Sequence, residues 1–123
     1  MKARVLVVDD AVVMRMMIKD ILSRNGFEVV GEAQNGAEAV EKYKDLRPDV
    51  VTMDMIMPGV DGISAVKQIV AVDPDAKILM CTSMGQEALL REAIEAGAKS
   101  YITKPFQPAK MVESIGKVLE PQP

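Results

Sequence analysis

The chain contains no histidine and no tryptophan, and its 123 residues include a single cysteine. Without histidine there is no Ser-His-Asp or Cys-His catalysis, no imidazole metal ligand, and no role as a phosphohistidine carrier. The lone Cys81 has no partner for an internal disulfide, which fits a reducing compartment such as the cytoplasm. Any chemistry must therefore rely on carboxylates, hydroxyls and lysine.

Long apolar runs and a positive charge excess are also missing. No segment approaches the ~18 consecutive apolar residues of a membrane span. Residues 1–4 lead directly into a strand-like segment, which leaves no room for a signal peptide. The formal net charge of −3 has the wrong sign for binding nucleic acid or an anionic membrane. We therefore expect a cytoplasmic, monomeric protein with neither nucleic acid nor membrane as a partner.

Short β-branched runs alternate with helical patterns five times along the chain. Strands are expected at 5–8, near 29–30, and at 50–53, 78–81 and 100–102. Helices are expected at 11–25, 36–47, 62–72 and 86–96, with a last helix from Pro108. This alternation predicts a doubly wound α/β domain, flavodoxin-like (βα)5, with a parallel sheet in the order 2-1-3-4-5. The domain should span residues 1–120, followed by a short tail at 121–123.

The first helix carries an apolar stripe that should face the sheet. We interpret its methionines as core or rim packing rather than a partner surface, and Arg15 as a solvated helix residue. Cys81, in the middle of a strand, is expected to be an inert core residue. The predicted stripe consists of Val13, Met14, Met17, Ile18, Ile21 and Leu22.

Acidic residues follow two strands that should be neighbours. Asp9 and Asp10 end the first strand, and Asp54 ends the third. In such sheets the site lies beyond the carboxyl ends of the strands, so the three carboxylates should lie close together. Crowded carboxylates either raise their pKa values or bind a cation, and an all-oxygen set favours Mg²⁺. The alternative is that each aspartate is only a helix cap or a turn former.

The remaining strands at this edge supply hydrogen-bond donors. Thr82 and Ser83 end the fourth strand, and Lys104 ends the fifth. A hydroxyl and an ammonium beside a metal are the groups that a dianionic phosphoryl group needs on its oxygens. Taken alone, Lys104 could equally be a solvated lysine at a strand end. The combination favours a phosphoryl site.

These residues resemble the receiver domains of two-component systems over essentially the whole chain. The resemblance rests on Asp9-Asp10, on Asp54 within the segment 53–62, on Thr82, and on Lys104-Pro105-Phe106. It implies that Asp54 is the phosphoacceptor. It also implies that Asp10, Asp54 and the Ile56 carbonyl bind Mg²⁺ directly, with Asp9 acting through a water and Mn²⁺ able to substitute.

The resemblance further assigns a switch. Thr82 and Lys104 would bind the phosphoryl oxygens, and Tyr101 matches the aromatic residue that turns inward when the threonine engages the phosphoryl group. It also implies a cis peptide bond before Pro105. The changed surface would be helix 86–96, strand 100–103 and the last helix.

Within receivers, the segments 9–22 and 104–108 are similar to free-standing chemotaxis regulators of the CheY type. This implies a sensor histidine kinase of the chemotaxis type as phosphoryl donor and the flagellar motor switch protein as output partner. The protein would catalyse only its own phosphorylation and dephosphorylation.

Ile56 and Met84 occupy two positions that influence hydrolysis of the aspartyl phosphate in receivers. Both are apolar, so we expect slow self-dephosphorylation and a separate phosphatase.

Other functions fit less well. The chain could be a phosphorelay intermediate or a receiver fragment of a larger regulator, although its Pro-rich tail and complete last helix favour a free-standing protein. An aspartyl-phosphate phosphatase would need a general acid two residues after the nucleophile, where this chain has Ile56. A flavodoxin-type cofactor binder would need a Gly-, Ser- or Thr-rich loop after the first strand, where Asp9-Asp10 stands instead.

Overall fold

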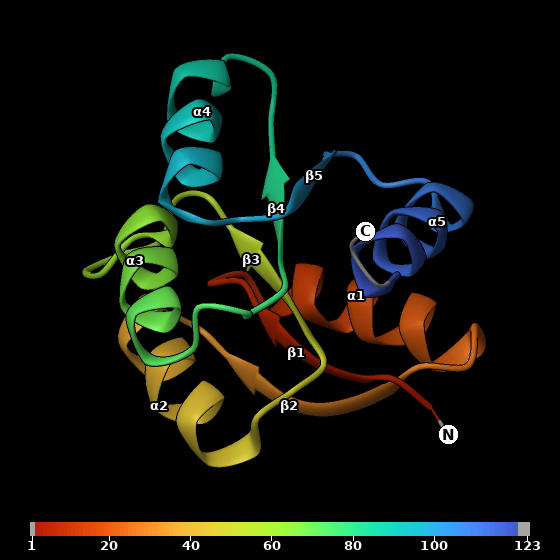
Figure 1. Cartoon of the computed structure of the whole chain (residues 1–123). Coiled ribbons are helices and arrows are strands. Elements are labelled where there is room, and N and C mark those ends of the chain that lie inside the picture. The colour runs from red at the N-terminus through yellow and green to blue at the C-terminus, as the bar shows by residue number, and fades with distance from the viewer. Residues whose placement is uncertain (1, 121–123) are drawn as a thin grey trace.

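The computed structural model describes residues 2–120, in which five strands alternate with five helices (Figure 1). The predicted tail at 121–123 lies outside the described residues. The elements are β1 (Arg4–Val8), α1 (Val12–Arg24), β2 (Glu28–Ala33), α2 (Gly36–Leu46), β3 (Val50–Asp54), α3 (Gly62–Val72), β4 (Ile78–Thr82), α4 (Glu87–Ala96), β5 (Ser100–Thr103) and α5 (Pro108–Leu119). None of the helices within residues 2–120 is long and apolar enough to cross a membrane.

The strands form one parallel sheet in the order β2-β1-β3-β4-β5, which confirms the predicted fold. Helices α2, α3 and α4 cover one face of the sheet, and α1 and α5 cover the other (Figure 1). Strands β3 and β4 are buried along their whole length because both of their faces are covered. Such strands are expected to be almost continuously apolar, as these are.

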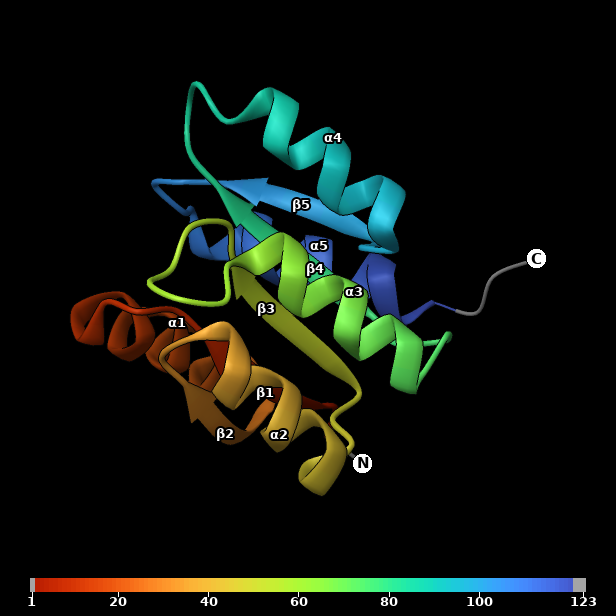
Figure 2. The same cartoon turned by 90° about the vertical axis from the view of Figure 1, so that its left-hand side faces the viewer.

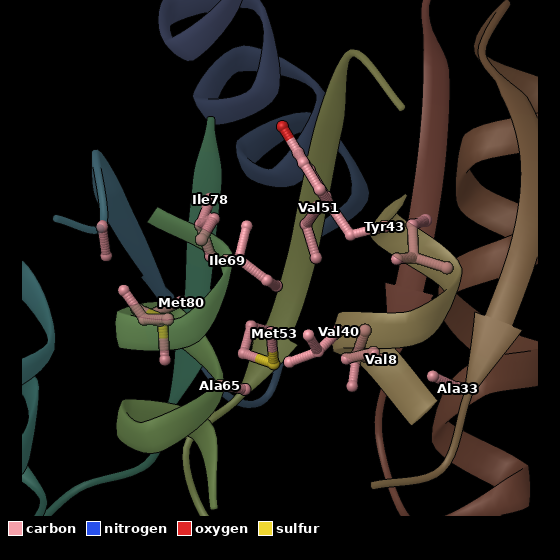
Figure 3. Packing of buried hydrophobic residues seen from close by; sticks show 14 of the residues in the cluster. Val8, Ala33, Val40, Tyr43, Val51, Met53, Ala65, Ile69, Ile78 and Met80 are labelled. Carbon is pink, nitrogen blue, oxygen red and sulfur yellow. The ribbon is translucent and has the colours of Figure 1, made fainter. Parts of the chain in front are cut away.

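Two apolar layers hold the helices on the sheet. In one, Met53 of β3 and Met80 of β4 pack toward Val40, Ala65 and Ile69 of α2 and α3 (Figure 3). The layer on the other face contains Cys81, as predicted, and burial raises the pKa of its thiol to about 12. The core therefore fixes the strands without involving the acidic residues at their ends.

The prediction of which α1 residues face the sheet was partly wrong. Met14, Ile18, Ile21 and Leu22 do meet the sheet and α5. Val13, however, is 73% exposed, and Met16 and Met17 are also exposed, so these methionines are not core residues. The sheet-facing stripe is narrower than the run of apolar residues, because α1 lies in an outer layer and its other flank faces solvent.

Thr52 places a hydroxyl in the middle of the core. Its neighbours across the sheet are Val7 and Leu79, and its Oγ1 is the one buried side-chain oxygen or nitrogen within residues 2–120 without a hydrogen-bond partner. Leaving a polar group unbonded in the core costs free energy, and valine has nearly the same shape.

We expect Thr52→Val to raise the free energy of unfolding by about 1 kcal/mol in urea denaturation. Thr82→Val, which removes a bonded hydroxyl, is the control that should give no gain; a lower unfolding midpoint for Thr52→Val would contradict this account.

Candidate functional site

The loops that follow β3 and β4 lie at the same edge of the sheet (Figure 2). Lys104 follows β5 at this same edge. Its side chain passes the end of β4 and reaches Asp54 at the end of β3. Its Nζ lies 3.0 Å from Asp54 Oδ1 and 3.2 Å from Asp9 Oδ2. The structure therefore brings the predicted acidic residues and the predicted lysine together through two direct ion pairs.

The three predicted acidic residues form one cluster. Each of Asp9, Asp10 and Asp54 offers a carboxylate oxygen, and these oxygens lie within 4.8 Å of one another. Asp9 and Asp54 are buried, while Asp10 is exposed. Ligands that are all oxygen, with one side open to water, suit a hard cation such as Mg²⁺, which keeps several waters when bound. The residues present therefore fit the predicted metal.

Burial raises the pKa of Asp54 to about 6, and the neighbouring Asp9 and Asp10 act in the same direction, although Lys104 opposes them. Burial alone would lower the pKa of Lys104, but its bonds to Asp54 and Asp9 outweigh this and raise it. Lys104 therefore stays charged at neutral pH. When Asp54 is ionised, its buried negative charge needs compensation from the Lys104 ammonium and from a cation.

We expect the affinity for Mg²⁺ to fall as the pH drops below about 6, because a proton on Asp54 competes with the cation. With one competing group, the dissociation constant should rise about tenfold for each pH unit below the pKa. Titrating Mg²⁺ against amide chemical shifts at pH 5, 6 and 7 measures this. Asp54→Asn should lose this part of the pH dependence, and an affinity that is flat from pH 5 to 7 in the wild type would contradict the assignment.

Asp9 is held from several sides. Its Oδ1 accepts a hydrogen bond from the Ala11 N–H at 2.9 Å, and its own N–H donates to Ala33 of β2. Its backbone carbonyl accepts from Arg15 Nη1, while Arg15 Nε lies 3.1 Å from Glu32 Oε1. The interpretation of Arg15 as a solvated residue was wrong, because its side chain is only 12% exposed and supports the turn after β1.

The loop between β3 and α3 is fastened at both ends by close backbone contacts. The Gly36 N–H donates to the Val60 carbonyl at 3.0 Å, and a Cβ on Gly36 would overlap that carbonyl. A Cβ on Gly62 would overlap the Asp54 carbonyl. Ile56 lies in this loop with 55% of its surface exposed, and its role as a backbone ligand stays a prediction.

Thr82 and Tyr101, the two predicted switch residues, lie in different surroundings. Thr82 is buried at the end of β4, and its hydroxyl donates to Gln86 Oε1 at 3.1 Å. Tyr101 is 51% exposed on β5. Both line a pocket of about 310 Å³, together with Met84 and Leu90. Gln86 was not among the predicted site residues, because a glutamine at the start of a helix carries no sequence pattern of its own.

The predicted cis peptide bond between Lys104 and Pro105 is present. It leads from the lysine at the site toward α5, which begins at Pro108. Residues 104–108 therefore connect the acidic cluster to the last helix directly.

Comparison with known proteins identifies the relatives of this chain. Residues 5–116 match the family model of the response regulator receiver domain. The chain is 60% identical to the chemotaxis protein CheY of Thermotoga maritima over 118 residues, covering 96% of this chain and 98% of that protein. It is 59% identical to CheY of Bacillus subtilis over 119 residues, covering 97% and 99% of the two chains.

Solved structures agree with these relatives. The crystal structure of the CheX-CheY-BeF3-Mg²⁺ complex from Borrelia burgdorferi contains a chain that matches with a TM-score of 0.92 and 35% identity, over 97% of this chain and 90% of that one. The response regulator domain of Thermotoga maritima CheB matches with a TM-score of 0.91 and 39% identity over the whole of both chains. The fold, the clustered aspartates and these similarities together establish that the chain belongs to the response regulator receiver family, among proteins similar to the chemotaxis regulator CheY.

Proposed function

We propose that this protein is a chemotaxis response regulator that accepts a phosphoryl group on Asp54 from a histidine kinase in a Mg²⁺-dependent reaction. The phosphorylated form then binds an output partner, the flagellar motor switch, through α4, β5 and α5. The observation that carries the proposal is the contact of Lys104 with both Asp54 and Asp9, within a cluster of three carboxylates. A lysine that merely ends a strand is expected to extend into solvent. The side chain of Lys104 instead passes the neighbouring strand and contacts two carboxylates.

The groups of this chain have distinct parts in the transfer. An oxygen of Asp54 forms a bond to phosphorus while the phosphorus–nitrogen bond of the donor breaks. The electron pair of the broken bond stays on the donor's imidazole nitrogen, which a water molecule then protonates. Lys104 neutralises charge on the phosphoryl oxygens, and its partly buried position strengthens that interaction. Bound Mg²⁺ would supply further charge compensation to those oxygens, held by Asp10, Asp54 and the Ile56 carbonyl, with Asp9 acting through a water.

Phosphorylation would switch the surface through Thr82 and Tyr101. Once the Thr82 hydroxyl turns to the phosphoryl group, the pocket that it shares with Tyr101 changes shape and the ring can move inward. A groove of about 470 Å³ lies beside Tyr101 and is lined by residues of β5 and α5, among them Lys110, Glu113 and Lys117. This groove supports β5 and α5 as parts of the output surface, since its residues include Tyr101 of the proposed switch.

The test uses acetyl phosphate and a phosphorylated chemotaxis-type histidine kinase as separate donors, each with Mg²⁺ and with EDTA. We expect a labile phosphoryl adduct that mass spectrometry maps to Asp54, formed only with the metal. The phosphorylated protein should bind the flagellar motor switch protein more tightly than the unphosphorylated one. Equal labelling in EDTA, or label on Asp9 or Asp10, would overturn the proposal.

A further inference from the structure

Gln86 receives two hydrogen bonds from the end of β4. Its Oε1 accepts from the Ser83 N–H at 2.7 Å and from the Thr82 hydroxyl at 3.1 Å. A backbone N–H can only donate, so the amide oxygen of Gln86 must face residues 82 and 83. The orientation of the amide is thereby fixed, and Thr82 is the second donor to the same oxygen.

The hydroxyl of Thr82 has one proton to give. Apart from Gln86, the acceptor near it is the Ser83 carbonyl, at a longer 3.4 Å. Thr82 is also only 4% exposed, so water does not compete freely for the hydroxyl. Because one proton serves one strong bond at a time, Thr82 must give up Gln86 before it can donate to a phosphoryl oxygen on Asp54.

Gln86 also stands at the junction between the site and α4. It is the residue preceding the first turn of the helix, and its own carbonyl accepts from the Leu90 N–H at 2.9 Å. Its side chain makes no cap bond to the helix, so the amide is turned back to β4. The bond from Thr82 therefore ends on the residue immediately before α4, a helix of the proposed output surface.

We infer that Gln86 is a positioning residue that holds Thr82 in its unphosphorylated arrangement and sets how readily a phosphoryl group switches the protein. The inference rests on the proposed function, which it extends by a residue outside the phosphoryl site. A ligand shifts a two-state equilibrium only by its differential interaction with the two states. Removing the acceptor that favours the resting state therefore lets the same phosphoryl group shift the equilibrium further.

The experiment measures the affinity for beryllofluoride, a mimic of the phosphoryl group, in the presence of saturating Mg²⁺. Gln86→Met keeps a straight side chain of similar length but removes the amide acceptor. The loss of one neutral hydrogen bond from the resting state should tighten binding of the mimic about fivefold. Chemical shifts of the Thr82 and Tyr101 amides should show that the bound state itself is unchanged.

A double-mutant cycle with Thr82→Val separates this role from a general loosening of α4. In the Thr82→Val background, Gln86→Met should leave the affinity unchanged, because no hydroxyl remains to be held. If Gln86→Met does not fold, Gln86→Glu gives the reverse test. Its charged acceptor should hold Thr82 more strongly and weaken binding of the mimic, by more in the wild-type background than with Thr82→Val.

Equal affinity of the wild type and Gln86→Met, or a gain that persists with Thr82→Val, would overturn the inference and leave the proposed function intact. A wild type that binds no beryllofluoride would overturn the proposed function and this inference with it. A fivefold gain confined to the background with Thr82 would establish Gln86 as the residue that opposes switching.

Discussion

Asp54→Asn is expected to reduce phosphoryl incorporation from acetyl phosphate to background, a loss of at least about a hundredfold, because a neutral amide is a far weaker nucleophile than a carboxylate. The same variant should be more stable than the wild type. Burial raises the pKa of Asp54 from 3.8 to about 6, so the folded state binds more protons than the unfolded state between these values. Stability therefore falls as the pH rises from about 4 to about 6, and asparagine removes that loss.

At pH 7 without metal, we expect Asp54→Asn to raise the free energy of unfolding by roughly 1–2 kcal/mol, with a smaller difference near pH 4. Urea denaturation at both pH values, beside phosphorylation monitored by mass spectrometry, measures both effects. Asp61→Asn is a matched control, because Asp61 caps α3 in the same loop and asparagine also caps well. It should keep full phosphorylation. Label on the Asp54→Asn protein would show that Asp54 is not the phosphoacceptor, and a loss of stability at pH 7 would show that burial does not destabilise its carboxylate.

The second expected result is a long phosphoryl lifetime in the wild type and a short one in Ile56→Asn/Met84→Glu. Hydrolysis needs a water held in line with phosphorus, and polar side chains beside the site can orient it. Ile56 is 55% exposed and Met84 is 89% exposed, so neither replacement disturbs the core. We expect the double variant to lose its phosphoryl group at least about tenfold faster.

Loss of label over time, after removal of the donor, measures the lifetime. Val72→Asn offers a control, since Val72 is also an exposed apolar residue but lies at the far end of α3. Its decay should equal that of the wild type. A wild type that loses the group within seconds, or a double variant that is no faster, would refute this explanation. A long lifetime would require a separate phosphatase to end the signal.

The sequence allowed the fold and the grouping of the site to be predicted, because both follow from the order of elements. Covered parallel strands have continuous apolar runs, and residues such as Asp54 and Lys104 that end such strands must meet at one edge. The error on Val13 and Met17 arose because periodicity reports which residues are apolar, and not how much of a helix the sheet covers.

The roles of Arg15 and Gln86 depended on information that a pattern does not contain. Arg15 joins a carbonyl after β1 to Glu32 on β2, and Gln86 turns back from α4 to β4. Both contacts are side-chain hydrogen bonds between elements whose relative placement becomes known only in three dimensions. Polar residues of this kind resemble ordinary helix surface residues in the sequence.

Lys104 ties the end of β5 to the ends of β3 and β1, past the strand that lies between them. The three residues are far apart in the chain, so the site is complete only when the first, third and fifth strands have all been placed. A partly folded or truncated chain that lacks β5 keeps its carboxylates but has no ammonium beside Asp54. Under the proposed function, efficient phosphorylation would therefore report that the first, third and fifth strands are all in place.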